Sequence, residues 1–207
     1  MAGDPQVPEA MSRLDGDDLR AMFAAAMLLL ERNVDSINAL NVFPVPDGDT
    51  GTNMFLTMRA ISDAPGPAKG TPAGDVAATM ARSALMEARG NSGVILSQFY
   101  RGWAAALQGK DSLTGEDVAV ALHQATGAAY KAVSSPVEGT ILTVIKEAAR
   151  AAEETVASGE VDPKRVWESA CVGARKALAE TPDLLPVLKE AGVVVNMPFL
   201  TWPGGSR

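Results

Sequence analysis

Two aspartates stand one residue apart in the segment N-V-F-P-V-P-D-G-D-T-G-T-N-M, residues 41–54. Pro44 and Pro46 exclude a helix from the approach, so Asp47 and Asp49 are expected on a loop. Two carboxylates that turn toward one point repel each other unless a cation lies between them. Mg²⁺ is commonly bound by one or two carboxylates together with water and substrate phosphates. The pair therefore favours a magnesium site, although aspartate and glycine also form ordinary capped turns.

The residues after the aspartates have the composition of a phosphate-binding helix start. They are Thr50, Gly51, Thr52 and Asn53. Free backbone N–H groups and the helix dipole attract anions at such a start, and anion ligands beside cation ligands are what a metal-bound nucleotide requires. Two familiar alternatives do not fit. No G-x-x-x-x-G-K-[ST] loop occurs, and an EF-hand loop counted from Asp47 would need glycine at Thr52 and glutamate at Met58.

Two further loops of small, hydroxylic residues precede predicted helices. The first is R-G-N-S-G at 89–93 and the second is S-S-P-V-E-G-T at 134–140. Each loop taken alone reads equally well as a helix break with a capping residue. If all three loops meet at one end of the molecule, they form a rim that binds phosphate and metal. The candidate residues on these two loops are Asn91, Ser92, Gly93 and Thr140.

The rest of the chain has the apolar periodicity of amphipathic helices, and no pair of strands is indicated. Thr114 with Asp117 resembles a capping box, and Asp162 before Pro163 is a typical helix start. Short loops between amphipathic helices predict an all-α protein, an antiparallel eight-helix bundle or barrel. The predicted helices cover about 16–37, 53–63, 75–89, 94–107, 115–133, 140–156, 163–180 and 184–191.

Composition and charge restrict the class of protein. The 207 residues are 47% hydrophobic and 21% charged, which suits one globular domain with a sizeable core. The net charge of -7 argues against nucleic acid and anionic membranes as main partners. Cys171 is the single cysteine, so no internal disulfide can form. Because no signal peptide and no membrane-length apolar run occurs, the chain is expected to be cytoplasmic.

Three motifs together resemble one family. The segment 41–54, the segment R-G-N-S-G-V-I-L-S-Q-F-Y-R-G and the segment S-S-P-V-E-G-T-I-L-T-V are similar to the nucleotide-binding component of bacterial fatty-acid kinase, and more broadly to the nucleotide-binding domain of the dihydroxyacetone kinase L subunit. The resemblance covers residues 15–194. It leaves 1–14 as a flexible N-terminal segment and 195–207 as an atypical or truncated tail, in which V-N-M-P-F-L-T-W-P-G-G-S-R replaces the aspartate and glycine-rich residues usual in the family.

The resemblance implies an eight-helix antiparallel barrel that binds ATP and two Mg²⁺ ions at one end. Asp47 and Asp49 would be the metal ligands through which catalysis occurs. Asn41 lies near the place of a further aspartate in the dihydroxyacetone kinase branch, with a spacing one residue longer. The residues that would contact the nucleotide are Thr50, Gly51, Thr52, Asn53, Asn91, Ser92, Gly93 and Thr140.

The implied activity is phosphoryl transfer from ATP to the carboxylate of a fatty acid that a separate lipid-binding carrier protein presents. A dihydroxyacetone (glycerone) kinase activity is the first alternative, and a non-catalytic nucleotide-binding module is the second. The resemblance implies that the fatty-acid kinase component carries further domains, and at 207 residues this chain is expected to lack them. The acceptor, the carrier partner, the activity of the chain alone and a homodimeric state therefore stay open.

Overall fold

The structure is a computed structural model that describes residues 13–63 and 68–193. These residues are all-helical apart from one isolated antiparallel bridge between Leu14 and Leu113, which confirms the all-α prediction. The helices are α1 Gly16–Glu31, α2 Val34–Ala39, α3 Thr50–Asp63, α4 Ala73–Met86, α5 Gly90–Ala106, α6 Gly115–Lys131, α7 Ile141–Ala157, α8 Pro163–Leu184 and α9 Pro186–Glu190. The predicted tail 195–207 and most of the predicted N-terminal segment 1–14 lie outside the described residues.

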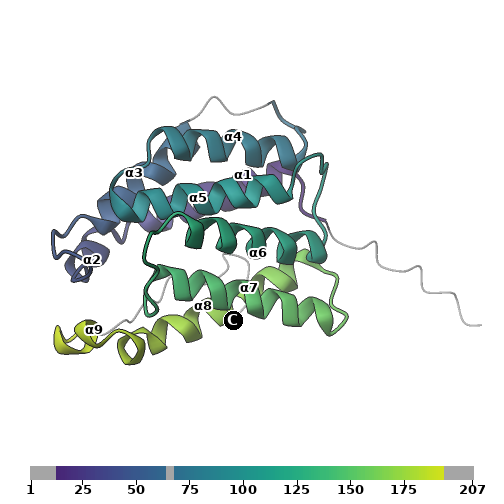
Figure 1. The fold of residues 1–207 in the computed structure, drawn as a ribbon. Coiled ribbons are helices and arrows are strands. Elements are labelled where there is room, and N and C mark those ends of the chain that lie inside the picture. The colour runs from purple at the N-terminus through teal and green to yellow at the C-terminus, as the bar shows by residue number, and fades with distance from the viewer. Residues whose placement is uncertain (1–12, 64–67, 194–207) are drawn as a thin grey trace, which may run out of the picture.

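The helices from α4 to α8 pack in chain order, each against the next. Short connections join them, so neighbouring helices run in opposite directions. Figure 1 shows α4, α5, α6 and α7 stacked in this way, with α1 and α3 against α4 and α5 and with α2 and α9 at the same end of the stack. The antiparallel order therefore brings the start of α5, the end of α6, the start of α7 and the end of α8 to one end of the bundle.

The predicted first helix is two helices in the structure. α1 ends at Glu31 and α2 begins at Val34, although the apolar spacing continues across the break. The Asn33 side-chain amide donates to the Leu29 carbonyl at 2.7 Å, a local bond that competes with the helical ladder. The prediction of one continuous helix is therefore wrong, and the break allows α2 to turn toward α3.

The eighth helix is longer than predicted, because it continues through a proline. α8 continues to Leu184 with Pro182 inside it, whereas the sequence predicts an end before Thr181. Proline lacks the N–H that would bond the carbonyl four residues earlier. The Thr181 hydroxyl supplies that bond instead, donating to the Leu178 carbonyl at 2.8 Å. A side chain next to the proline thus keeps the helix end satisfied.

Two predicted helix starts are confirmed. Thr114 and Asp117 form a capping box at the start of α6, and Asp162 caps α8 with Pro163 at the first turn. Other starts are displaced. α3 begins at Thr50 rather than near 53, and α5 begins at Gly90 rather than after 93. Both shifts move predicted loop residues into the first turn of a helix.

An aromatic cluster fills the bundle interior between α1, α5 and α8. Trp103 is 2% exposed, and its ring lies edge-on to that of Trp167 with centroids 5.4 Å apart. Phe23 lies 5.2 Å from Tyr100, whose hydroxyl donates to the Met58 sulfur at 2.7 Å. The Trp103 indole N–H has no hydrogen-bond partner among the described residues, so its packing contacts alone fix it.

Gly102, which precedes Trp103 in α5, allows α5 and α6 to lie in close contact. A Cβ built on Gly102 would lie 2.5 Å from the Gln124 carbonyl oxygen and 2.7 Å from the Ala125 Cα. Both atoms belong to the α6 backbone, so side-chain motion cannot relieve the contact. Within the described residues no helix has the length and apolar character needed to cross a membrane.

Candidate functional site

A cavity of about 540 Å³ opens at the end of the bundle where α2 and α9 lie. Four segments that are distant in sequence line it: the α2–α3 connection, the start of α5, the α6–α7 loop and the α8–α9 junction. All three loops singled out by the sequence therefore border one space. The sequence-predicted residues in the lining are Asn41, Thr50, Asn91, Ser92 and Thr140.

The two aspartates lie on the loop beside this cavity, outside its lining. Asp47 and Asp49 are exposed. The Asn41 side-chain amide, which does line the cavity, donates to an Asp47 carboxylate oxygen at 2.5 Å. Asn41 thus connects the acidic loop to the cavity edge.

The donor set on this loop suits a hydrated divalent cation. Over the described part of the chain, neither Asp47 nor Asp49 has an ion pair, so the negative charge of both carboxylates is uncompensated by protein. No group of three or more His, Cys, Asp or Glu side chains gathers as a metal site in residues 13–63 and 68–193. Two carboxylates with the remaining ligands from water and phosphate are the arrangement typical of Mg²⁺ and not of a closed protein cage.

The first turn of α3 presents only part of its predicted ligand set to the cavity. Thr50 is in the lining. Gly51 is buried, and a Cβ there would lie 2.4 Å from the Val34 carbonyl oxygen. Asn53 is 8% exposed and packs against Gly90 of α5. The positions of Gly51 and Asn53 therefore serve close packing, and their contact with phosphate stays a prediction.

Sequence reasoning missed Asn38, which holds the start of α3. Its side-chain oxygen accepts from the Thr52 N–H at 3.2 Å, and its side-chain N–H donates to the Thr52 hydroxyl at 3.0 Å. Asn38 thereby satisfies one of the free N–H groups of the α3 N-terminus from another helix. The signal available in the sequence was weak, because an asparagine fourteen residues before its partner has no local pattern.

Replacement of Asn38 by alanine is expected to lower the free energy of unfolding by about 1 kcal/mol, the usual effect of losing a side-chain cap. Urea denaturation followed by circular dichroism measures it. Asn33→Ala is a useful comparison, because the Asn33 side-chain amide bonds to a carbonyl only four residues earlier and does not cap α3. An Asn38→Ala variant as stable as the parent protein would show that α3 does not need this cap.

The R-G-N-S-G segment is the first turn of α5 rather than a loop before it. Asn91 and Ser92 face the cavity, and the Ser92 hydroxyl lies 3.5 Å from the Thr50 carbonyl oxygen. Gly93 is buried instead, and a Cβ there would lie 2.7 Å from the Thr57 hydroxyl. Gly93 therefore permits the close contact of α5 with α3, and its predicted contact with ligand is untested.

Gly90 requires glycine for two reasons. Its φ is +58°, in the left-handed region that side-chain-bearing residues avoid. A Cβ there would also lie 2.4 Å from the Asn53 side-chain nitrogen. This glycine lets α5 begin directly beside α3, which places Asn91 and Ser92 next to Thr50.

The opposite wall of the cavity is mainly apolar. Thr140 caps α7 through the Leu142 N–H and donates its hydroxyl proton to the Val137 carbonyl at 2.8 Å. Leu185 and Leu188, at the α8–α9 junction, complete this wall. The other apolar lining residues on this side are Ala132, Val133, Val137, Ile141 and Leu142.

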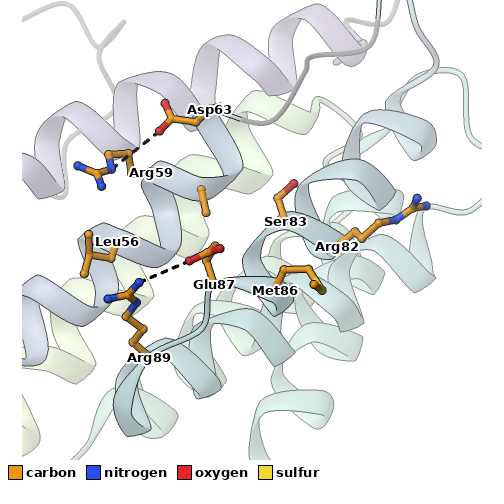
Figure 2. A pocket seen from close by; sticks show the side chains of 9 residues that line it. Leu56, Arg59, Asp63, Arg82, Ser83, Met86, Glu87 and Arg89 are labelled. Carbon is orange, nitrogen blue, oxygen red and sulfur yellow. Dashed lines mark ion pairs between the residues drawn. The ribbon is translucent and has the colours of Figure 1, made fainter.

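A second groove, of about 450 Å³, lies between α3 and α4 and extends to Arg89 at the start of α5. Figure 2 shows Arg59 paired with Asp63 and Arg89 paired with Glu87, at 3.9 and 3.7 Å. All four side chains of these pairs are more than half exposed. Arg82 adds a third positive charge to this groove. The end cavity is the stronger candidate for a ligand site because all three sequence motifs border it.

Comparison with known proteins gives one family and several relatives. The model of the DAK2 domain matches residues 44–197. The chain is 45% identical over 181 residues to Protein YloV of Bacillus subtilis (strain 168), covering 87% of this chain and 32% of that protein. It is 42% identical over 184 residues to an uncharacterized protein of Staphylococcus aureus (strain bovine RF122 / ET3-1), covering 89% and 33%. The chain thus spans about a third of the length of these curated relatives.

Proposed function

The chain belongs to the DAK2 domain family, and from this premise we propose that it is an ATP- and magnesium-dependent kinase domain that transfers phosphate at the end cavity. The acceptor we propose is the carboxylate of a fatty acid presented by a separate lipid-binding protein. The observation that carries the proposal is the convergence of three separate sequence motifs on one cavity. Membership of the dihydroxyacetone kinase family supports the nucleotide-binding part of it.

The division of the cavity wall supports one orientation of the nucleotide. Asn41, Thr50, Asn91 and Ser92 supply polar groups on one side, among apolar residues such as Phe43 and Ile95. These polar groups lie close to the N-termini of α3 and α5, where anions are favoured. The side built by the α6–α7 loop and the α8–α9 junction is mainly apolar, with the hydroxyls of Ser134, Ser135 and Thr140 as its polar groups, and suits a flat base. The phosphates are therefore placed toward α3 and α5, beside the acidic loop.

Asp47 and Asp49 are the residues that would hold the metal. Bound there, Mg²⁺ would neutralise the charge of the phosphates and of the loose transition state for phosphoryl transfer. The protein's own part is to keep these two carboxylates beside the phosphate side of the cavity. Asn41 contributes by fixing Asp47 through its 2.5 Å hydrogen bond.

The lining also bears on the acceptor. In the described part of the chain, the cavity wall contains no Asp, Glu, His, Lys or Arg side chain. A carboxylate acceptor is already ionised at neutral pH and needs no base, whereas the hydroxyl of dihydroxyacetone would need one from a partner. The lining therefore favours an acyl phosphate product over a phosphate ester.

Saturating Mg-ATP is expected to raise the melting temperature, because a ligand that binds only the folded state stabilises it. At a hundred times the dissociation constant the gain is ~2.7 kcal/mol, roughly 5–10 °C for a domain of this size. Differential scanning fluorimetry with ATP alone, Mg²⁺ alone and both together measures it. An unchanged melting temperature with both ligands would contradict nucleotide binding.

The acceptor is tested separately with radiolabelled ATP. The protein is incubated with a fatty acid on a lipid-binding carrier protein, with dihydroxyacetone, or with neither. Label in a hydroxylamine-sensitive acyl phosphate supports the proposal. Label in a stable ester identifies the dihydroxyacetone activity instead, and binding without any transfer identifies a non-catalytic module.

A further inference from the structure

One carboxylate, that of Glu138, holds the loop between α6 and α7. One of its oxygens accepts from the Thr143 hydroxyl at 2.6 Å and from the Lys146 ammonium group at 2.9 Å. The other accepts from the Tyr130 hydroxyl at 3.1 Å. Tyr130 lies in the last turns of α6, and Thr143 and Lys146 lie in the first two turns of α7. Glu138 therefore connects both helices across the loop.

The bond to Thr143 extends to the backbone of the cavity wall. The Thr143 side chain is 4% exposed, and its oxygen also accepts from the Gly139 N–H at 2.8 Å. A hydroxyl has one proton, so donation to Glu138 directs its lone pairs toward Gly139. Bonds from Thr143, followed by Lys146, hold the pKa of Glu138 below its usual value, which means that the ionised form is the one held.

Gly139 itself is confined on its other side. It is buried, and a Cβ there would lie 2.6 Å from the Leu185 Cβ. Gly139, Thr140 and Leu185 all line the cavity, while Glu138 does not. The hydrogen bonds that run from Glu138 through Thr143 to Gly139, called the relay below, thus end at the part of the cavity wall where the α6–α7 loop meets the α8–α9 junction.

We infer that Glu138 is a positioning residue for the nucleotide: through the Thr143 hydroxyl it fixes the Gly139–Thr140 wall of the cavity in the ligand-binding geometry. This inference rests on the proposed function, because the ligand is the proposed nucleotide. The physical reason is preorganisation. A wall that is already ordered spares the ligand the free energy of ordering it.

The test uses Glu138→Ala, Thr143→Val and Thr143→Ser, with Glu154→Gln as the matched control. Glu154 also pairs with a cation on α7, Arg150, but lies away from the loop. Calorimetry is expected to show Mg-ATP bound about tenfold more weakly by Glu138→Ala and Thr143→Val, the scale of a lost hydrogen bond to a charged group. Thr143→Ser, which retains the hydroxyl, and the control should bind like the parent protein.

Two further readouts separate positioning from simple stabilisation. In the protein without ligand, the Gly139 amide should exchange with solvent faster in Glu138→Ala and Thr143→Val. The double variant should bind no more weakly than either single one, because both remove the same relay. A lower melting temperature with unchanged Mg-ATP affinity would show a structural role only and would overturn the inference.

The remaining outcomes separate a failure of the proposed function from a failure of the role inferred for Glu138. If the parent protein does not bind Mg-ATP, the proposed function fails and this inference fails with it. If the parent binds and Glu138→Ala binds equally well, the inference alone is overturned. If Glu138→Ala does not fold, the comparison of Thr143→Val with Thr143→Ser decides, and equal affinities for these two would overturn the inference.

Discussion

Replacement of Asp49 by asparagine is expected to weaken Mg-ATP binding by about a hundredfold, the scale of losing a group that a metal site depends on. The exchange keeps the size of the side chain and removes the negative charge that would hold the cation. Asp49 is exposed and has no ion pair in the described structure, so little stability should be lost. Titration calorimetry with and without Mg²⁺ measures the effect.

The Mg²⁺-dependent part of the affinity is the decisive quantity. Binding of ATP without metal should be no weaker in Asp49→Asn than in the parent protein, because the exchange removes a repulsive charge, and only the increment gained with Mg²⁺ should disappear. Asp63→Asn is the matched control, because it removes an exposed carboxylate at the C-terminal end of α3, whereas Asp49 directly precedes the N-terminal end of that helix. An Asp49→Asn variant with the affinity of the parent would show that this loop is not the metal site.

The largest expected effect on stability comes from a single methyl group between α5 and α6. Gly102→Ala should lower the free energy of unfolding by about 1–3 kcal/mol, the cost of overpacking a close contact, since its Cβ would meet α6 backbone atoms at 2.5 and 2.7 Å. Gly127→Ala, on the exposed face of α6 with nothing within 4 Å, should instead add about 0.5–1 kcal/mol. Urea denaturation measures both.

The two variants test how closely other atoms surround each glycine, and they are expected to change the free energy of unfolding in opposite directions. Each replaces a glycine inside a helix by alanine, so the gain in helix propensity is shared and only the surroundings differ. A stabilised Gly102→Ala would mean that α5 and α6 are further apart than the structure places them. Destabilisation of Gly127→Ala would mean that something contacts this face of α6.

Local signals in the sequence were enough to predict the helices that begin at a strong cap. Thr114 with Asp117, and Asp162 with Pro163, each carry the whole start signal within four residues. The break at Asn33 and the continuation of α8 through Pro182 could not be predicted. Each depends on a side-chain bond to a backbone carbonyl that either competes with the helical ladder or replaces a missing part of it.

The candidate site was predictable to the level of its loops and less so to the level of its residues. Three motifs predicted three loops, and the fold brings all three segments to one cavity, although the R-G-N-S-G segment forms the first turn of α5. Gly93 and Asn53 are predicted to contact the nucleotide. Both are buried where α3 meets α5, and their contact with a ligand stays a prediction. Asn38 had no motif of its own, and Glu138 stands within S-S-P-V-E-G-T without being singled out, since the roles of both depend on partners that the fold supplies.

The pair of tryptophans inside the bundle gives this protein its own spectroscopic signature. Trp103 and Trp167 join α5 to α8 edge to face, and rings fixed in such an asymmetric setting produce circular dichroism in the near ultraviolet. That band would vanish if the interior loosened, even while the far-ultraviolet signal of the helices persisted. One spectrum can therefore tell a protein that has lost a ligand contact from one that has lost its rigid interior.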